Sequence, residues 1–139
     1  PVIVDDSGLV IDAFDGFPGP YSSFVEDTLG IERVWNLAER EDDRSAAFRA
    51  VVAYCDGETV GASPADDGPA AASGDPPVAL FEGRVSGTLV APRGDGGFGF
   101  DPIFEYEGET FAEMGVEAKN AISHRGQALA TFAEWYAER

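Results

Sequence analysis

The sequence predicts a single α/β domain in which a mixed, twisted sheet is flanked by helices. Three observations favour this class. Apolar runs of strand length are interspersed with segments of helical spacing. The 139 residues show no internal repeat and suffice for one core, and 44% of them are hydrophobic. We therefore expect residues 1–139 to belong to one domain.

Apolar segments are predicted to form the sheet. Val2–Val4 has the composition of a buried strand that ends in a turn at Asp5–Gly8, and Leu9–Ile11 follows as a second short strand. Residues 46–55 are apolar at odd and even positions, which is typical of a central strand buried on both faces. Residues 78–90 alternate apolar with polar side chains, so one face of that strand is expected to be exposed.

Glycines, prolines and helical spacing predict the remaining elements. Gly83 and Gly87 in the last of these strands predict β-bulges. We expect residues 14–20 to form a rigid loop that leads into one or two helices over Phe24–Leu37, and residues 61–77 to form another loop. Ser123 is a candidate N-cap for a terminal helix. The core face of this helix is expected to carry Leu129, Phe132 and Tyr136.

The chain is strongly acidic. Nine Lys and Arg residues against 26 Asp and Glu residues make its net charge −17. Such a field repels nucleic acids and anionic lipids, so neither is expected as a partner. Lys119 is the only lysine, a composition that resembles halophilic proteins; the alternative is an ordinary acidic protein. Because Cys55 is the only cysteine and no apolar run approaches ~18 residues, we expect a cytoplasmic protein without a membrane span.

Three short motifs contain candidate site residues. Asp5 and Asp6 are adjacent, so on a strand only one of them can face a given cleft; the alternative is ordinary turn chemistry. Gly94–Gly99 satisfies G-x-G-x-x-G, but no helix is predicted after it, which excludes a dinucleotide-binding turn. Its glycines favour a loop that holds Phe98 out for stacking on a flat ligand; the alternative is a hairpin loop with Phe98 in the core.

The third motif, Lys119–Arg125, brings together cations that are scarce elsewhere in the chain. Besides Lys119 it contains the only histidine, His124, and ends on Arg125. Donors at a helix start favour a site for anionic or carbonyl oxygens, and the alternative is a helix cap with a surface salt bridge. Zinc sites, Walker A loops and G-x-S-x-G elbows do not occur in the sequence.

Several motifs, in this order, resemble the inosine triphosphate pyrophosphatase family, whose members hydrolyse non-canonical purine nucleoside triphosphates such as ITP, dITP and XTP. They are Asp5–Leu9, Gly16–Ser22, Gly97–Phe104, Phe111–Met114, and Lys119–Asn120 with Ser123–Arg125. The resemblance implies cleavage between the α- and β-phosphates with Mg²⁺ and homodimer formation. It implies that Asp6 is the catalytic residue and a metal ligand, and that Phe98 stacks on the base. The other substrate-binding residues that it implies are Ser7, Gly99, Phe100, Asp101, Lys119, His124 and Arg125.

The chemistry of the bases agrees with this assignment. Inosine and xanthine carry a 6-keto acceptor where adenine has a 6-amino donor. Lys119 and Arg125 are pure donors and therefore favour the keto bases. An adenine amino group would leave these buried donors without hydrogen-bond partners. Such a mismatch can lower the specificity constant for the wrong base by roughly 10⁴. Guanine shares the keto group, and the sequence does not indicate how it would be rejected.

The family opens with a strand, a lysine-containing phosphate loop and a helix that supplies a metal-binding glutamate, and this chain begins after that region. We therefore expect an incomplete domain, with little or no pyrophosphatase activity of its own. One alternative is an inactive remnant that binds nucleotide or forms dimers. Another is a metal-dependent phosphatase with Asp5 or Asp6 as nucleophile, although such enzymes use a D-x-D spacing.

Overall fold

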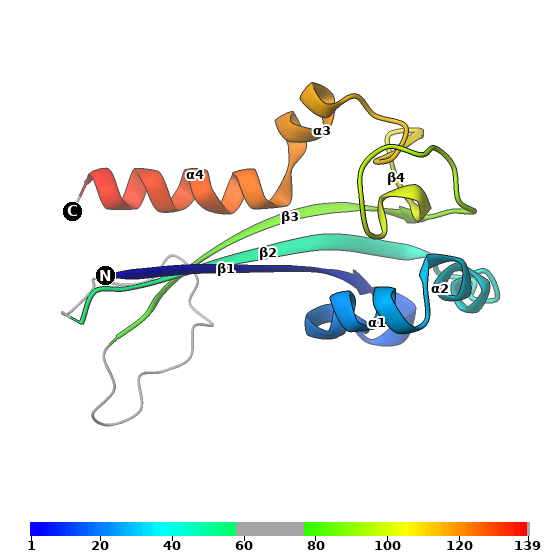
Figure 1. Ribbon diagram of the computed structural model, residues 1–139, viewed down its shortest axis with the longest axis horizontal. Coiled ribbons are helices and arrows are strands. Elements are labelled where there is room, and N and C mark those ends of the chain that lie inside the picture. Colours follow the sequence, from blue (N-terminus) through cyan, green and yellow to red (C-terminus); the bar gives the residue numbers. More distant parts are fainter. Residues whose placement is uncertain (58–76, 139) are drawn as a thin grey trace.

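The computed structural model describes residues 1–57 and 77–138, so the loop predicted at 61–77 lies almost wholly outside the described residues. The described strands form one five-stranded sheet in the order β1-β2-β3-β4-β5 (Figure 1). They span Val2–Ile11 (β1), Ser45–Cys55 (β2), Ala79–Leu89 (β3), Phe104–Tyr106 (β4) and Glu109–Thr110 (β5). The predicted α/β class is confirmed, and all pairings among these strands are antiparallel, so the parallel pairing of a mixed sheet does not occur among them.

Helices lie on both sides of this sheet. In Figure 1, α3 and α4 lie above the sheet, whereas α1 and α2 lie below its end. The α-helices span Ser22–Thr28 (α1), Ile31–Ala38 (α2), Val116–Ile122 (α3) and His124–Ala137 (α4), and short 3-10 turns occupy Asp12–Phe14, Gly19–Tyr21 and Asp101–Ile103. Gly30, with φ of 85°, separates α1 from α2, which confirms the prediction for residues 24–37. None of the described helices is long and apolar enough to cross a bilayer.

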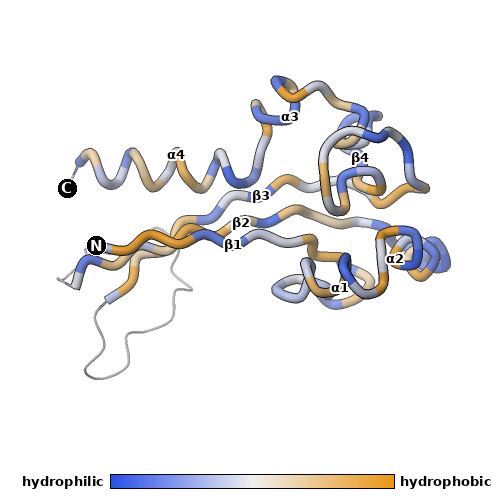
Figure 2. Tube along the Cα trace, viewed as in Figure 1, coloured by the Kyte–Doolittle hydropathy of each residue, from blue (hydrophilic) through white to orange (hydrophobic). Residues whose placement is uncertain are grey.

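The first strand differs from its prediction in two ways. Val2–Ile11 is one unbroken strand, because its pairing with β2 runs from Val2 opposite Cys55 to Ile11 opposite Ala46. The expected turn at Asp5–Gly8 is therefore wrong. Val2, Ile3 and Val4 are 61%, 49% and 58% exposed, although the sequence predicted them to be buried. Their apolar character is visible at the start of β1 in Figure 2, on the strand that forms one edge of the described sheet.

The next two strands follow their predictions on one face. β2 is central as expected, and its even positions from Ala46 to Tyr54 are buried. Its other face is only partly covered, since Arg49 is exposed. β3 shows the predicted alternation, with Phe81 buried and Glu82 exposed. The described register runs through β3 without a bulge, which makes the bulge prediction for its glycines wrong.

The glycines of β3 instead permit close packing. A Cβ at Gly83 would lie 1.8 Å from the carbonyl oxygen of His124, so only a glycine lets the start of α4 approach this strand so closely. A Cβ at Gly87 would lie 2.3 Å from the carbonyl oxygen of Glu105. β3 thus fixes the position of α4 through close contact with the main chain at the start of that helix.

The described residues form a core of two clusters. One is centred on Phe48, Phe104 and Phe111 and includes buried residues of β1, α1 and α2. The other joins Val52 and Phe81 to Ala128 of α4. Partly buried residues that pack against the second cluster are Phe132 and Trp135. The predicted core face of the terminal helix is thus correct for Phe132 and wrong for Leu129 and Tyr136, which are 42% and 53% exposed, because the helix turns its Ala128 side to the sheet.

Candidate nucleotide-binding site

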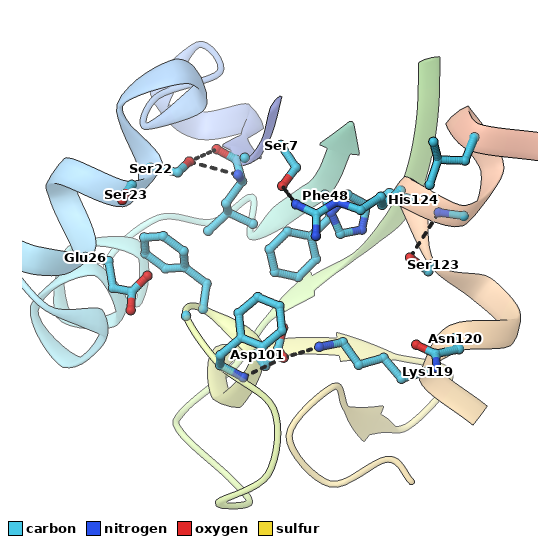
Figure 3. A pocket seen from close by; sticks show the side chains of 18 residues that line it. Ser7, Ser22, Ser23, Glu26, Phe48, Asp101, Lys119, Asn120, Ser123 and His124 are labelled. Atoms are coloured by element: carbon cyan, nitrogen blue, oxygen red, sulfur yellow. Dashed lines mark hydrogen bonds and ion pairs between the residues drawn. The ribbon is translucent and has the colours of Figure 1, made fainter. Parts of the chain in front are cut away.

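A cavity of about 580 Å³ lies beside β1, bordered by α1, the Gly97–Phe100 loop and the junction of α3 with α4 (Figure 3). Every substrate-binding residue that the sequence predicted lines this cavity: Ser7, Phe98, Gly99, Phe100, Asp101, Lys119, His124 and Arg125. Its volume is in the range of small-molecule binding pockets. The fold therefore brings together residues that are up to 118 positions apart in the chain.

The glycine-rich loop presents an aromatic ring at this cavity. Phe98 is 75% exposed, so the alternative that it belongs to the core is wrong. Gly97 and Gly99 have φ of 67° and 62°, and a Cβ at Gly97 would lie 2.2 Å from Oδ2 of Asp101. The same oxygen accepts the backbone N–H of Phe98 at 3.0 Å. The two glycines and Asp101 thus hold the loop in a conformation that leaves the ring free to stack.

A buried ion pair lies behind this ring. The Lys119 ammonium donates to Oδ2 of Asp101 at 2.5 Å, and these side chains are only 18% and 5% exposed. The Lys119 Nζ atom also lies 4.4 Å from the centroid of the Phe98 ring. Because Asp101 is the only hydrogen-bond acceptor of this ammonium among the described residues, two of its three N–H groups are available to a ligand.

His124 forms part of the cavity wall as a partly buried imidazole. Its ring stacks on Phe48 with the centroids 5.2 Å apart and the planes at 14°. Burial lowers the pKa of His124, and the positive charge of Arg125 lowers it further. The imidazole is therefore neutral at pH 7. Its Nδ1 atom is buried and has no hydrogen-bond partner among the described residues, which leaves it able to pair with a polar group of a ligand.

Ser123 begins α4 and places the two following side chains at the cavity. As predicted, its side chain caps the helix, accepting the backbone N–H of Gly126 at 3.2 Å. Arg125 forms an ion pair with Asp5, with Nε 2.8 Å from Oδ2, and donates from Nη2 to Oγ of Ser7 at 3.4 Å. The features of the alternative interpretation, a cap and a salt bridge, are thus present in residues that also line the cavity.

Other residues of the sequence motifs join β1 to α1. The Ser22 hydroxyl accepts the backbone N–H of Leu9 at 2.9 Å and donates to the carbonyl oxygen of Gly19 at 2.7 Å. A Cβ at Gly8 would lie 2.3 Å from that carbonyl oxygen, so the close approach requires glycine. Gly8, Gly19 and Ser22 therefore shape the cavity by fixing the position of α1 against the strand.

Asp6 lies outside the main cavity. It borders a smaller hollow that Arg49 and Val51 also line, and Ser7 and Gly8 contribute to both spaces. Oδ1 of Asp6 accepts the backbone N–H of Ser7 at 2.9 Å, and its other oxygen has no hydrogen bond within the described part of the chain. The structure thus places the predicted catalytic carboxylate next to the predicted substrate-binding residues without joining it to them.

The described residues contain no group of three or more His, Cys, Asp or Glu side chains that could hold a metal ion. Asp5 and Asp6 cannot ligate one ion together from opposite faces of β1. Mg²⁺ is commonly held by one or two carboxylates together with substrate phosphates. Asp6, exposed and with one oxygen available, fits the role of a single carboxylate ligand.

Sequence reasoning missed five residues of the cavity wall. They are Ser23, Glu26, Phe48, Gly126 and Leu129. Glu26 follows Ser22 by four positions in α1, so the two share one helix face, and this spacing is the signal that could have identified Glu26. Figure 3 shows Glu26 on α1, across the cavity from the Lys119 side.

Residues 1–135 match the Ham1 family in a comparison with known protein families. The chain belongs to the Ham1 family. This Ham1-family chain is 49% identical, over 137 residues, to a protein of Methanosarcina mazei named "dITP/XTP pyrophosphatase", and 50% identical, over 139 residues, to one of the same name from Methanopyrus kandleri. Each alignment covers 98% of the chain and 65% of the relative. The predicted family resemblance is confirmed, and the chain spans about two thirds of the length of these relatives.

A solved structure agrees with this Ham1-family assignment. The Ham1 protein of Staphylococcus aureus is 33% identical to the chain and superposes with a TM-score of 0.77. The superposition covers 99% of this chain and 68% of that protein. The fold as well as the sequence is therefore that of the family.

Proposed function

We propose that this chain binds non-canonical purine nucleoside triphosphates, ITP, dITP and XTP, and takes part in their hydrolysis to the nucleoside monophosphate and pyrophosphate. The observation that carries the proposal is the convergence of all eight predicted substrate-binding residues on one cavity. The names of the Methanosarcina and Methanopyrus relatives support the same activity.

In the proposed complex the purine stacks on Phe98, and its 6-keto oxygen accepts hydrogen bonds from Lys119 and Arg125. Both side chains line the cavity and have N–H groups that are not used by described residues. An adenine amino group would face these donors with another donor, leaving them unpaired in the complex. The cavity therefore favours the keto bases over adenine.

Hydrolysis requires water to attack the α-phosphorus while the bond to the oxygen that bridges to the β-phosphate breaks, releasing pyrophosphate. One carboxylate oxygen of Asp6 makes no hydrogen bond to described residues, and the neighbouring Ser7 borders both spaces. We assign Asp6 the role of accepting the proton of this water. Asp6 would also hold Mg²⁺, which when bound neutralises charge on phosphate oxygens. A chain of net charge −17 repels a triphosphate at long range, so the local cations of the cavity must supply the attraction.

Pyrophosphate release from ITP, dITP, XTP, GTP and ATP tests the proposal, with nucleotide binding measured in parallel. We expect binding of ITP and XTP to exceed that of ATP, and Asp6→Asn to abolish any hydrolysis while leaving the unfolding midpoint unchanged. Selective binding without pyrophosphate release would favour the alternative of a binding-only protein. Release of orthophosphate would indicate the phosphatase alternative, and equal binding of ITP and ATP would refute the proposed base specificity.

Homodimer formation and a cytoplasmic location complete the proposal. The family resemblance supports the dimer, and the single cysteine Cys55 supports a reducing compartment. Light scattering coupled to size exclusion measures the oligomeric state, and a monomer at the working concentration would contradict the dimer.

A further inference from the structure

The side chains of Asp5 and Asp6, which are adjacent on β1, lie on opposite faces of the sheet. Asp5 is paired with Val52, which is buried in the cluster that contains Ala128 of α4. Asp6 is paired with Val51, which lines the smaller hollow. Since directly paired residues point to the same face, Asp5 lies on the side of α4 and Asp6 on the other side. Asp5 is therefore not a second carboxylate for the reaction that Asp6 serves.

The contact of Asp5 is Arg125, one of the two proposed donors to the base. Nε of Arg125 forms an ion pair with Oδ2 of Asp5 at 2.8 Å, and Oγ of Ser7 accepts a hydrogen bond from Nη2 at 3.4 Å. A guanidinium has five N–H groups in a rigid plane. The groups on Nη1 make no hydrogen bond to described residues, and the ion pair with Asp5 and the hydrogen bond to Ser7 hold the guanidinium against β1.

The exposure of the Asp5–Arg125 pair limits its contribution to the stability of the fold. The Arg125 and Asp5 side chains are 49% and 43% exposed, and ion pairs so open to solvent contribute little to stability. Arginine, however, loses much rotamer freedom when it is fixed by a ligand. An arginine already held by Asp5 loses less on binding.

We infer that Asp5 is a positioning residue that orients Arg125 toward the 6-keto oxygen, and that it sets the preference for keto purines over adenine. The inference rests on the proposed function, because it concerns the base that the cavity selects. A keto base uses the oriented donors, whereas adenine does not. Loss of Asp5 therefore weakens the binding of ITP and leaves the binding of ATP unchanged.

The test is equilibrium binding of ITP and ATP to the full chain, with Asp5→Asn as the main variant. Asp42→Asn is the control for the loss of one negative charge, because Asp42 lies in an exposed segment away from the cavity. We expect Asp5→Asn to raise the Kd of ITP about threefold to tenfold, the range for immobilising one such side chain. The Kd of ATP should stay within about twofold of the unaltered chain, and Asp42→Asn should change neither value selectively.

Two further variants separate positioning from a general effect. In an Arg125→Ala background, Asp5→Asn should cause no additional loss of ITP binding, because the group that it positions is absent. Asp5→Glu, which keeps the carboxylate, should recover part of the preference for ITP. Additive losses, equal losses for ITP and ATP, or no loss in Asp5→Asn would each overturn the inference. Failure of the proposed function is distinguishable, because the unaltered chain would then show no preference for ITP over ATP.

Discussion

Replacing Phe98 by alanine should separate nucleotide affinity from folding. The ring is 75% exposed and belongs to neither core cluster, so we expect its loss to change the free energy of unfolding by no more than about 0.5 kcal/mol. Asp101 still holds Lys119 and the Phe98 backbone N–H in the variant. The loop therefore keeps its conformation and loses only its stacking surface.

Stacking of a base on an aromatic side chain contributes roughly 1–3 kcal/mol, or about 5- to 150-fold in Kd. Because every purine has a stacking face, Phe98→Ala should weaken the binding of ITP, XTP, GTP and ATP by similar factors. The Lys119 ammonium, 4.4 Å from the ring centroid, also loses a cation–π contact, but it keeps the N–H groups that we propose bind the base.

Isothermal titration with each nucleotide measures these affinities, and urea denaturation measures stability. Phe24→Ala is the matched control, because Phe24 is 67% exposed in α1 and does not line the cavity. The reasoning is refuted if Phe98→Ala binds nucleotides normally, or if Phe24→Ala weakens binding to the same extent. A loss confined to keto purines would likewise show that the ring acts by something other than stacking.

Four other outcomes are expected. Gly97→Ala should unfold at lower urea and bind ITP more weakly, because its φ of 67° and the 2.2 Å approach to Asp101 both require glycine; unchanged stability would contradict this. Phe81→Ala should lose about 3–5 kcal/mol of stability in urea denaturation, since Phe81 is fully buried, while Phe81→Leu should lose less. The pKa of His124 is lowered mainly by burial, so the unfolded chain binds more protons and stability should fall as pH drops below about 6.5; this decline should shrink in His124→Asn. Val4→Lys should reduce self-association in light scattering, because Val4 is 58% exposed on an edge strand.

Local chemistry predicted most of the elements because their signals are short-range. Ser123 caps α4 as predicted, and Gly30 interrupts the helical stretch where a break was allowed. The turn predicted at Asp5–Gly8 was wrong because a long-range interaction outweighed the local signal. Its residues are typical of turns, but β2 offers each of them a strand partner, and the continuous ladder outweighs the local preference.

The wall of the cavity depends on contacts that no local pattern encodes. The stacking of His124 on Phe48 and the approach of Arg125 to Asp5 join distant parts of the chain. Motif matching identified the residue types without their pairings. The sequence indicated that only one of Asp5 and Asp6 could face a given cleft, but not what each face of the sheet would contact, because that depends on the register of β1 with β2.

The close contact at Gly83 bears on how this protein tolerates change at its surface. Any side chain at Gly83 would collide with the carbonyl oxygen of His124. The contact between the two main chains therefore fixes the position of the start of α4 on the sheet. Many of the 26 acidic residues lie on exposed positions that do not take part in this packing. Changes to these surface carboxylates can therefore alter the net charge without disturbing the contact between β3 and the start of α4, where His124 and Arg125 line the cavity.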